Sequence, residues 1–223
     1  MQKLIAGIHH FQANLFSSQR ELFERLAHEQ FPDALFITCS DSRINPNLIT
    51  NTNPGDLFIL RNAGNIIPAH GAANGGEGAT IEFAVVGLGI RDIVVCGHSN
   101  CGAMKGLLSP EILKEMPAVE AWLSHAEATR RVVQLKYPNL DVDARLNVTV
   151  QENVLIQLEN LRTHPAVAAA VSSATLKLHG WVYKIETGQI FAYDPSTGQF
   201  APITDHAPPP LPASARSAAL RAM

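Results

Sequence analysis

Short apolar runs that alternate with helical patterns constrain the fold of this chain more than any other feature of its sequence. Three such runs, each long enough for one buried strand, cover residues 34–38, 57–60 and 92–96. Between the second and third runs, residues 81–88 carry apolar side chains at the spacing of one helix face. Longer helical patterns follow near residues 118–136 and 146–162. A strand, a helix and a strand in this order favour parallel pairing. The sequence therefore predicts an α/β fold with a parallel central β-sheet flanked by helices.

The two ends of the chain differ from this central part. Apolar side chains recur at helical spacing in residues 1–30, which predicts an N-terminal helical arm. Residues 178–185 and 190–193 predict the two strands of an antiparallel edge hairpin. Residues 201–223 are rich in proline and alanine and poor in large apolar side chains, so they predict a C-terminal tail. We expect one domain over residues 1–200, followed by this tail.

Composition excludes several classes of protein. Apolar residues make up 46% of the chain and the net charge is −3, which is typical of a globular protein and not of one that binds nucleic acid. The N-terminal segment lacks the apolar core of a secretory signal, and no stretch resembles a membrane span. Three cysteines are too few, and odd in number, for a disulfide scaffold. We therefore expect a cytoplasmic protein that uses its thiols for metal binding or catalysis.

Cysteine and histidine residues stand where two of the predicted strands end. Cys39 begins residues 39–43 after the first strand, and residues 98–101 begin with His98 and end with Cys101 after the third strand. A single Cys or His at such a place is more often packed than bound to a metal, but the carboxyl ends of parallel strands meet at one edge of the sheet. Two thiolates and an imidazole suit zinc and leave a fourth position for water. The sequence predicts a catalytic zinc site with these three ligands.

Asp41 and Arg43 follow the first of these ligands. Taken alone, they form a surface ion pair of little energetic value. Beside Cys39, however, Arg43 would hold the Asp41 carboxylate away from the metal, and Asp41 would orient the nucleophile through a hydrogen bond. If the carboxylate turned inward, Asp41 would become a conditional fourth ligand and close the site. We expect the open arrangement, in which Asp41 pairs with Arg43.

Cys96 and the glycine-rich residues 74–78 are expected to have structural roles and not to take part in metal or phosphate binding. Cys96 lies within the third predicted strand, so we expect it to pack in the core and not to bind the metal. Residues 74–78 are rich in glycine, but they lack the Lys-Ser/Thr ending and the preceding strand of a phosphate-binding loop. We expect a turn that leads into a helix at this place.

The chain resembles the β-class carbonic anhydrases over roughly residues 1–200. The resemblance is carried by residues 39–43 (CSDSR), 61–65 (RNAGN) and 97–102 (GHSNCG). It implies a zinc lyase, with one zinc per chain, that interconverts carbon dioxide and bicarbonate through attack by zinc-bound hydroxide and release of a proton. It also implies a homodimer with a shared cleft, or a larger even-numbered homo-oligomer.

The same resemblance assigns residues to the substrate cleft. It gives the substrate-orienting glutamine at Gln30, which we count among the catalytic residues, and an apolar wall at Phe58, Ala63 and Phe83. Gly102 is assigned to substrate binding with them. Plant members of the family have Tyr and Val at the positions of Phe83 and Ala63, so the polarity and volume of the cleft differ here.

Several alternatives remain at this point. The same zinc site would suit a hydrolase of carbon disulfide or carbonyl sulfide, and a non-catalytic zinc scaffold would use the tail to bind partners. Bicarbonate-regulated relatives have a Trp three residues before the first Cys, where this chain has Phe36, so we expect no such allosteric site. Some segments also resemble carboxysomal relatives, which makes the carboxysome, with partners there, the alternative to the cytoplasm.

Overall fold

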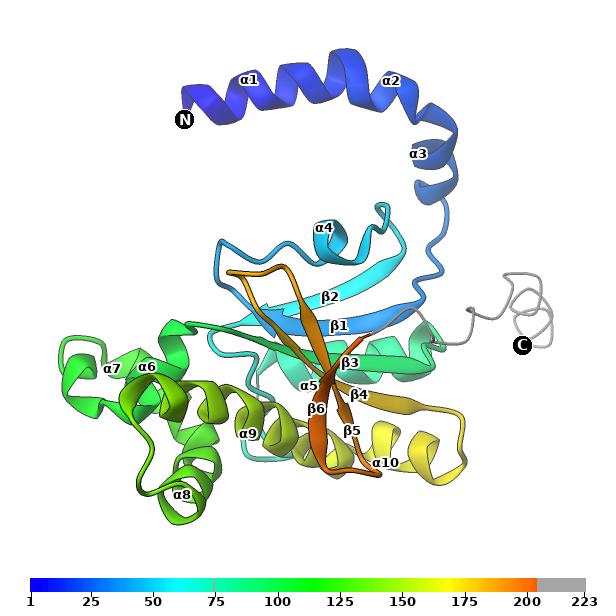
Figure 1. The fold of residues 1–223 in the computed structure, drawn as a ribbon. Helices are drawn as coiled ribbons and strands as arrows, with labels where there is room; N and C mark the ends of the chain where they lie inside the picture. The colour runs from blue at the N-terminus through cyan, green and yellow to red at the C-terminus, as the bar shows by residue number, and fades with distance from the viewer. Residues whose placement is uncertain (74, 204–223) are drawn as a thin grey trace.

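A mixed sheet of six strands forms the centre of the molecule in the computed structural model, which describes residues 1–73 and 75–203. The strands lie in the order β2-β1-β3-β4-β5-β6 (Figure 1). Their bounds are β1 Ala34–Cys39, β2 Leu57–Asn62, β3 Asp92–His98, β4 Lys177–Tyr183, β5 Ile190–Asp194 and β6 Gln199–Pro202. The first four strands are parallel, and β5 and β6 run antiparallel at one edge. The predicted fold class is therefore confirmed.

Strands β1 and β3 form the buried middle of the sheet because their apolar runs are covered on both faces. Residues Leu35 to Cys39 of β1 are all buried, and so are the last six residues of β3. In the parallel register, Cys39 lies beside Asn62 of β2, and Thr38 lies beside Cys96 of β3. The two strands thus end close together at the same edge, which positions the residues that follow them.

The helices that connect these strands along the chain pack on the sheet. Their bounds are α4 Pro46–Thr50, α5 Gly76–Glu82, η2 Phe83–Gly87, α6 Gly102–Leu108, η3 Pro110–Leu113, α7 Pro117–Leu123, η4 Ser124–Ala126, α8 Glu127–Lys136, α9 Val142–Thr163 and α10 Pro165–Ser172. The predicted helical pattern near residues 118–136 is divided between α7 and α8, because a short 3₁₀ turn lies between them. The glycine-rich turn leads into α5, as expected.

Helix α9 is the longest helix and crosses the sheet against β3 and β4 (Figure 1). The helix packs close to these two strands because each of them has a glycine at the contact, Gly97 in β3 and Gly180 in β4. A Cβ atom built on Gly97 would lie 2.9 Å from Val154, and one on Gly180 would lie 3.0 Å from the same side chain. Larger residues at these two positions would push the helix away from the sheet.

The N-terminal arm consists of α1 Gln2–His10, the π-helical turn η1 Phe11–Leu15, α2 Phe16–Ser18 and α3 Arg20–Leu26. None of these elements contains a buried residue, and the arm extends away from the sheet at the top of Figure 1. Among the described residues, no helix has the length and apolar character needed to span a membrane. Strand β6 ends at Pro202, two residues into the predicted tail, and the rest of that tail from residue 204 lies outside the described residues.

Candidate metal centre

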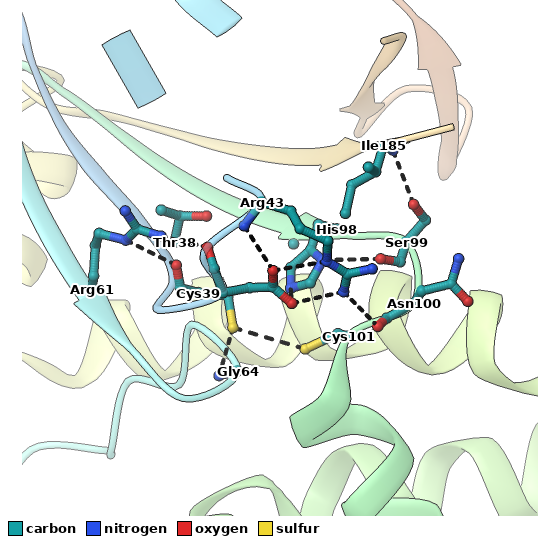
Figure 2. Close-up of polar contacts among 12 residues, drawn as sticks. Thr38, Cys39, Arg43, Arg61, Gly64, His98, Ser99, Asn100, Cys101 and Ile185 are labelled. Carbon is teal, nitrogen blue, oxygen red and sulfur yellow. Dashed lines mark hydrogen bonds and ion pairs between the residues drawn. The ribbon is translucent and has the colours of Figure 1, made fainter. Parts of the chain in front are cut away.

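Three ligand-type side chains converge at the carboxyl edge of the sheet. Cys39 is the last residue of β1, His98 is the last residue of β3, and Cys101 caps the N-terminus of α6 (Figure 2). One ligand atom from each residue lies within 4.8 Å of the other two, and all three residues are buried. The structure therefore brings together the three predicted metal ligands, although 62 residues separate the two cysteines.

The ring of His98 is oriented for metal binding. Its Nδ1 atom lies 2.9 Å from the carbonyl oxygen of Ser99, which can only accept a hydrogen bond, so Nδ1 carries the proton. Its Nε2 atom is buried and has no hydrogen-bond partner. An unprotonated nitrogen that faces two thiols without a partner is costly unless it binds a metal, so His98 fits a zinc ligand.

The two thiols also fit zinc. Their Sγ atoms are 4.0 Å apart, close to the roughly 3.8 Å expected for two sulfurs bound to one tetrahedral zinc. Hydrogen bonds, first from Cys101 and then from His98 and from the amide of Gly64 at 3.3 Å, together lower the pKa of Cys39 to about 4 although burial opposes them. Metal binding needs thiolates, and this surrounding stabilises one of them.

Asp41 and Arg43 form a two-bond ion pair beside the three ligands. The Nε and Nη2 atoms of Arg43 donate to the two carboxylate oxygens at 2.9 and 2.7 Å, and the backbone amide of Arg43 donates at 3.0 Å. These hydrogen bonds hold the pKa of Asp41 well below its usual range. The Oδ2 atom lies 3.9 Å from Nε2 of His98, so the carboxylate borders the cluster while Arg43 holds it. The expected ion pair is present.

Comparison with known proteins agrees with this geometry. A sequence model of the carbonic anhydrase family matches residues 34–190. The solved structure of the β-carbonic anhydrase CcaA is 54% identical, with a TM-score of 0.89, and the match covers 91% of this chain and 99% of that one. This chain belongs to the β class of the carbonic anhydrase family.

Curated relatives support the same assignment. A carbonic anhydrase from Synechocystis sp. is 56% identical over 87% of this chain and 71% of its own length. One from Synechococcus elongatus is 50% identical over 99% of this chain and 81% of its own length. The chain also resembles two tetrameric β-carbonic anhydrases of Sordaria macrospora, with 29% identity and a TM-score of 0.78 over 86% of this chain and 95% of that one.

The predicted cleft residues of this β-carbonic anhydrase fall into two groups. Ala63 directly follows β2, whose last residue pairs with Cys39, and Gly102 directly follows Cys101, so both lie at the metal cluster. The other three residues do not. Phe58 pairs with Leu35, four positions before Cys39 and therefore roughly 13 Å from it along the strand.

Gln30 and Phe83 complete the second group. Gln30 is exposed and precedes β1, so it lies beyond the end of the strand opposite to Cys39. Phe83 is 49% exposed, and its ring centroid lies 5.9 Å from that of Phe58. Within one chain, these three residues therefore lie away from the metal cluster and do not form its wall.

Sequence reasoning missed residues that support the ligands from behind. Arg61 belongs to the RNAGN motif, but the sequence does not indicate its role. Its Nε donates to the carbonyl of Cys39 at 3.0 Å and its Nη2 to that of Asp41 at 2.7 Å. On α9, the Asn153 amide nitrogen donates to the carbonyl of Gly64 at 3.0 Å. Two more amides, Gln157 and Asn160, bond the same loop at Ile67. Their recurrence on one buried helix face was the available signal.

Cys96 is separate from the metal cluster. It is fully buried in a small apolar cluster with Phe36 and Val94 on the other face of the sheet, and burial raises its pKa to about 12. A neutral thiol in apolar surroundings packs as a small hydrophobic side chain. The expectation that Cys96 belongs to the core is confirmed.

Proposed function

We propose that this β-carbonic anhydrase catalyses the reversible hydration of carbon dioxide to bicarbonate and a proton, with one zinc ion held by Cys39, His98 and Cys101. The observation that carries the proposal is the buried, unpartnered Nε2 of His98 facing two thiols. A zinc ion at these residues supplies a Lewis acid that makes water nucleophilic at neutral pH. Neither a scaffold nor a hydrolase of carbon disulfide is favoured by any feature of the site.

Asp41 and Arg43 act on the attacking water in this proposal. The carboxylate oxygen Oδ2 lies at the cluster and accepts a hydrogen bond from that water, which turns its lone pair toward carbon dioxide. Arg43 keeps the carboxylate in this position through its two bonds to it, and a third bond to the carbonyl of Asn100 anchors the guanidinium itself. If Arg43 released it, Asp41 would turn inward and become a fourth metal ligand.

The cleft is completed by a second copy of the chain. Gln30, Phe58 and Phe83 lie too far along the chain's own sheet to border their own metal cluster, so we infer that they line the cleft of a partner subunit. There Gln30 orients carbon dioxide, and the two rings give the cleft its apolar wall. Ala63 and Gly102 contribute from the subunit that holds the metal.

The arm offers a surface for this association. Its large apolar side chains are 39 to 63% exposed in the single chain, which is typical of an interface and not of a solvated helix. They are Leu4, Ile5, Ile8, Phe11 and Leu15. We therefore propose a homodimer or a larger even-numbered assembly, as the tetrameric relatives have.

The cytoplasm is the compartment that we propose. Cys39 and Cys101 must stay reduced to bind zinc, and a reducing compartment keeps such a close pair of thiols from oxidising. Fractionation of cells that express the chain would separate this proposal from the carboxysome, where partners would retain it in the particulate fraction.

Stopped-flow measurement of carbon dioxide hydration, combined with metal analysis, tests the function. We expect about one zinc per chain and rapid hydration. The Asp41→Asn variant should keep its zinc and lose turnover by about 10- to 100-fold. Asp92→Asn is the matched control, because Asp92 pairs with His179 at the opposite end of β3. A zinc-loaded chain that hydrolyses carbon disulfide but does not hydrate carbon dioxide would contradict the proposal.

A further inference from the structure

The turn formed by Ser99 and Asn100 connects the ligands His98 and Cys101, so its conformation sets where both ligands point. Asn100 has a φ of +57°, in the left-handed region that few residues other than glycine adopt and that Asn adopts more readily than most. Such a conformation persists where surrounding contacts fix it. The contacts of this turn therefore bear directly on the metal centre.

Ser99 is held at every polar atom. Its carbonyl oxygen accepts the hydrogen bond from His98 Nδ1 at 2.9 Å, and its backbone amide donates to the carbonyl of Tyr183 at 2.9 Å. Its hydroxyl oxygen accepts a hydrogen bond from the amide of Ile185 at 3.0 Å (Figure 2). The same hydroxyl donates to the Glu186 carboxylate at 2.6 Å. All these partners of the amide and hydroxyl come from β4 and the turn that follows it.

Glu186 contributes the strongest of these contacts. A hydroxyl that donates to a carboxylate at 2.6 Å makes a short, charge-assisted hydrogen bond. Glu186 is exposed, whereas Ser99 is only 2% exposed, so the carboxylate reaches inward to a buried partner. The hydrogen bond from Ser99 lowers the pKa of Glu186.

The same turn also supports the ion pair at the cluster. The carbonyl of Asn100 accepts a hydrogen bond from Nη2 of Arg43 at 3.2 Å, and Nη2 also bonds Asp41 (Figure 2). A change in the turn would therefore reach the ring of His98 on one side and the Asp41 carboxylate on the other.

We propose that Glu186 is a positioning residue of the metal centre: it fixes Ser99, whose carbonyl oxygen sets the tautomer and the direction of the His98 ring. The inference rests on the proposed zinc site. A group that accepts a hydrogen bond from the second ring nitrogen of a metal-bound histidine changes its metal affinity. Ser99 is that group for His98, and Glu186 acts on the metal centre only through its hydrogen bond with Ser99. It touches neither the metal ligands nor the substrate.

Zinc affinity, measured by competition with a chromogenic chelator, tests this role without reference to activity. We expect Glu186→Ala to bind zinc about tenfold more weakly than the original chain, at the lower end of the range for such outer groups. Glu186→Gln should recover most of the affinity, because its amide oxygen can still accept from Ser99. Asp194→Ala is the matched control, since Asp194 accepts a similar bond from the Ser196 hydroxyl at 2.7 Å, away from the ligands.

A second variant separates positioning from general stabilisation. Ser99→Ala removes the hydroxyl through which Glu186 acts, so adding Glu186→Ala to it should weaken zinc binding by less than about twofold more. A zinc affinity of Glu186→Ala within twofold of that of the original chain would overturn the inference. An equal loss of zinc affinity in Asp194→Ala would also overturn it, and so would a further tenfold loss in the double variant. If the original chain bound no zinc, the proposed function itself would fail, and this inference with it.

Discussion

Mixing two variants, one with low activity and one without zinc, shows which subunit supplies Gln30 to each metal centre. Gln30 precedes β1 and Cys39 ends it, and the strand between Ala34 and Cys39 alone spans roughly 16 Å. A glutamine side chain does not bridge that distance. We therefore expect Gln30 to contribute to the cleft of the partner subunit, while the metal ligands bind the zinc of their own chain.

The expected recovery of activity follows from this division. Gln30→Ala should lower turnover by about a hundredfold through loss of an orienting hydrogen bond, and Cys39→Ala should abolish zinc binding. In a mixed dimer, the Gln30→Ala subunit keeps its ligands and receives Gln30 from its partner, so one of the two sites is complete. Random assembly of equal amounts makes about half of the dimers mixed, so the unfractionated mixture should have about a quarter of the original activity per chain and the isolated mixed dimer about half.

Coexpression of the two variants with different affinity tags isolates the mixed dimers, and stopped-flow hydration measures their activity. Cys39→Ala mixed with His98→Ala is the control, because both residues bind the metal of their own chain and no complete site can form. Recovery in the first mixture and not in the second supports the shared cleft. Activity in both mixtures that stays at the level of the separate variants would refute it.

The remaining predictions concern single variants. Cys101→Ala should lose zinc in metal analysis, whereas Cys96→Ala should keep it and lose about 1 kcal/mol of unfolding free energy, because it only leaves a small cavity; equal zinc loss in both would contradict the ligand assignment. Asn153→Leu should cost about 2 to 4 kcal/mol in denaturant unfolding, since the carbonyl of Gly64 and the amide nitrogen of Gln157 lose their buried partner. An unfolding free energy equal to that of the original chain would show that these two hydrogen bonds of Asn153 do not stabilise the fold.

Local patterns were sufficient for the parts of the fold that are regular in sequence. The buried strands β1 and β3 are short apolar runs, and α9 has helical periodicity, so both could be predicted. Strand β6, which contains Phe200 among small and polar residues, has no such run. It forms because β5 offers an edge to pair with, and pairing between strands is not visible in the composition of one of them.

The metal centre also has parts that the sequence predicts and parts that it does not. The three ligands could be predicted because Cys39 and His98 end parallel strands and Cys101 follows His98 by three residues, and parallel strands bring their ends together. The contacts behind them could not: Glu186 meets Ser99 across 87 residues, and Asn153 meets Gly64 across 89. The resemblance to known carbonic anhydrases placed Gln30 in a cleft shared between subunits, and the length of β1 explains why Gln30 does not reach the metal cluster of its own chain.

X-ray absorption at the zinc edge measures the ligand set of the bound zinc. We expect two sulfur atoms at about 2.3 Å and one imidazole nitrogen at about 2.0 to 2.1 Å, with one further light atom. The Cys101→Ala variant, if it retains any zinc, should show one sulfur fewer. A metal shell in the original chain without sulfur, or with only one sulfur atom, would contradict the assignment of Cys39, His98 and Cys101.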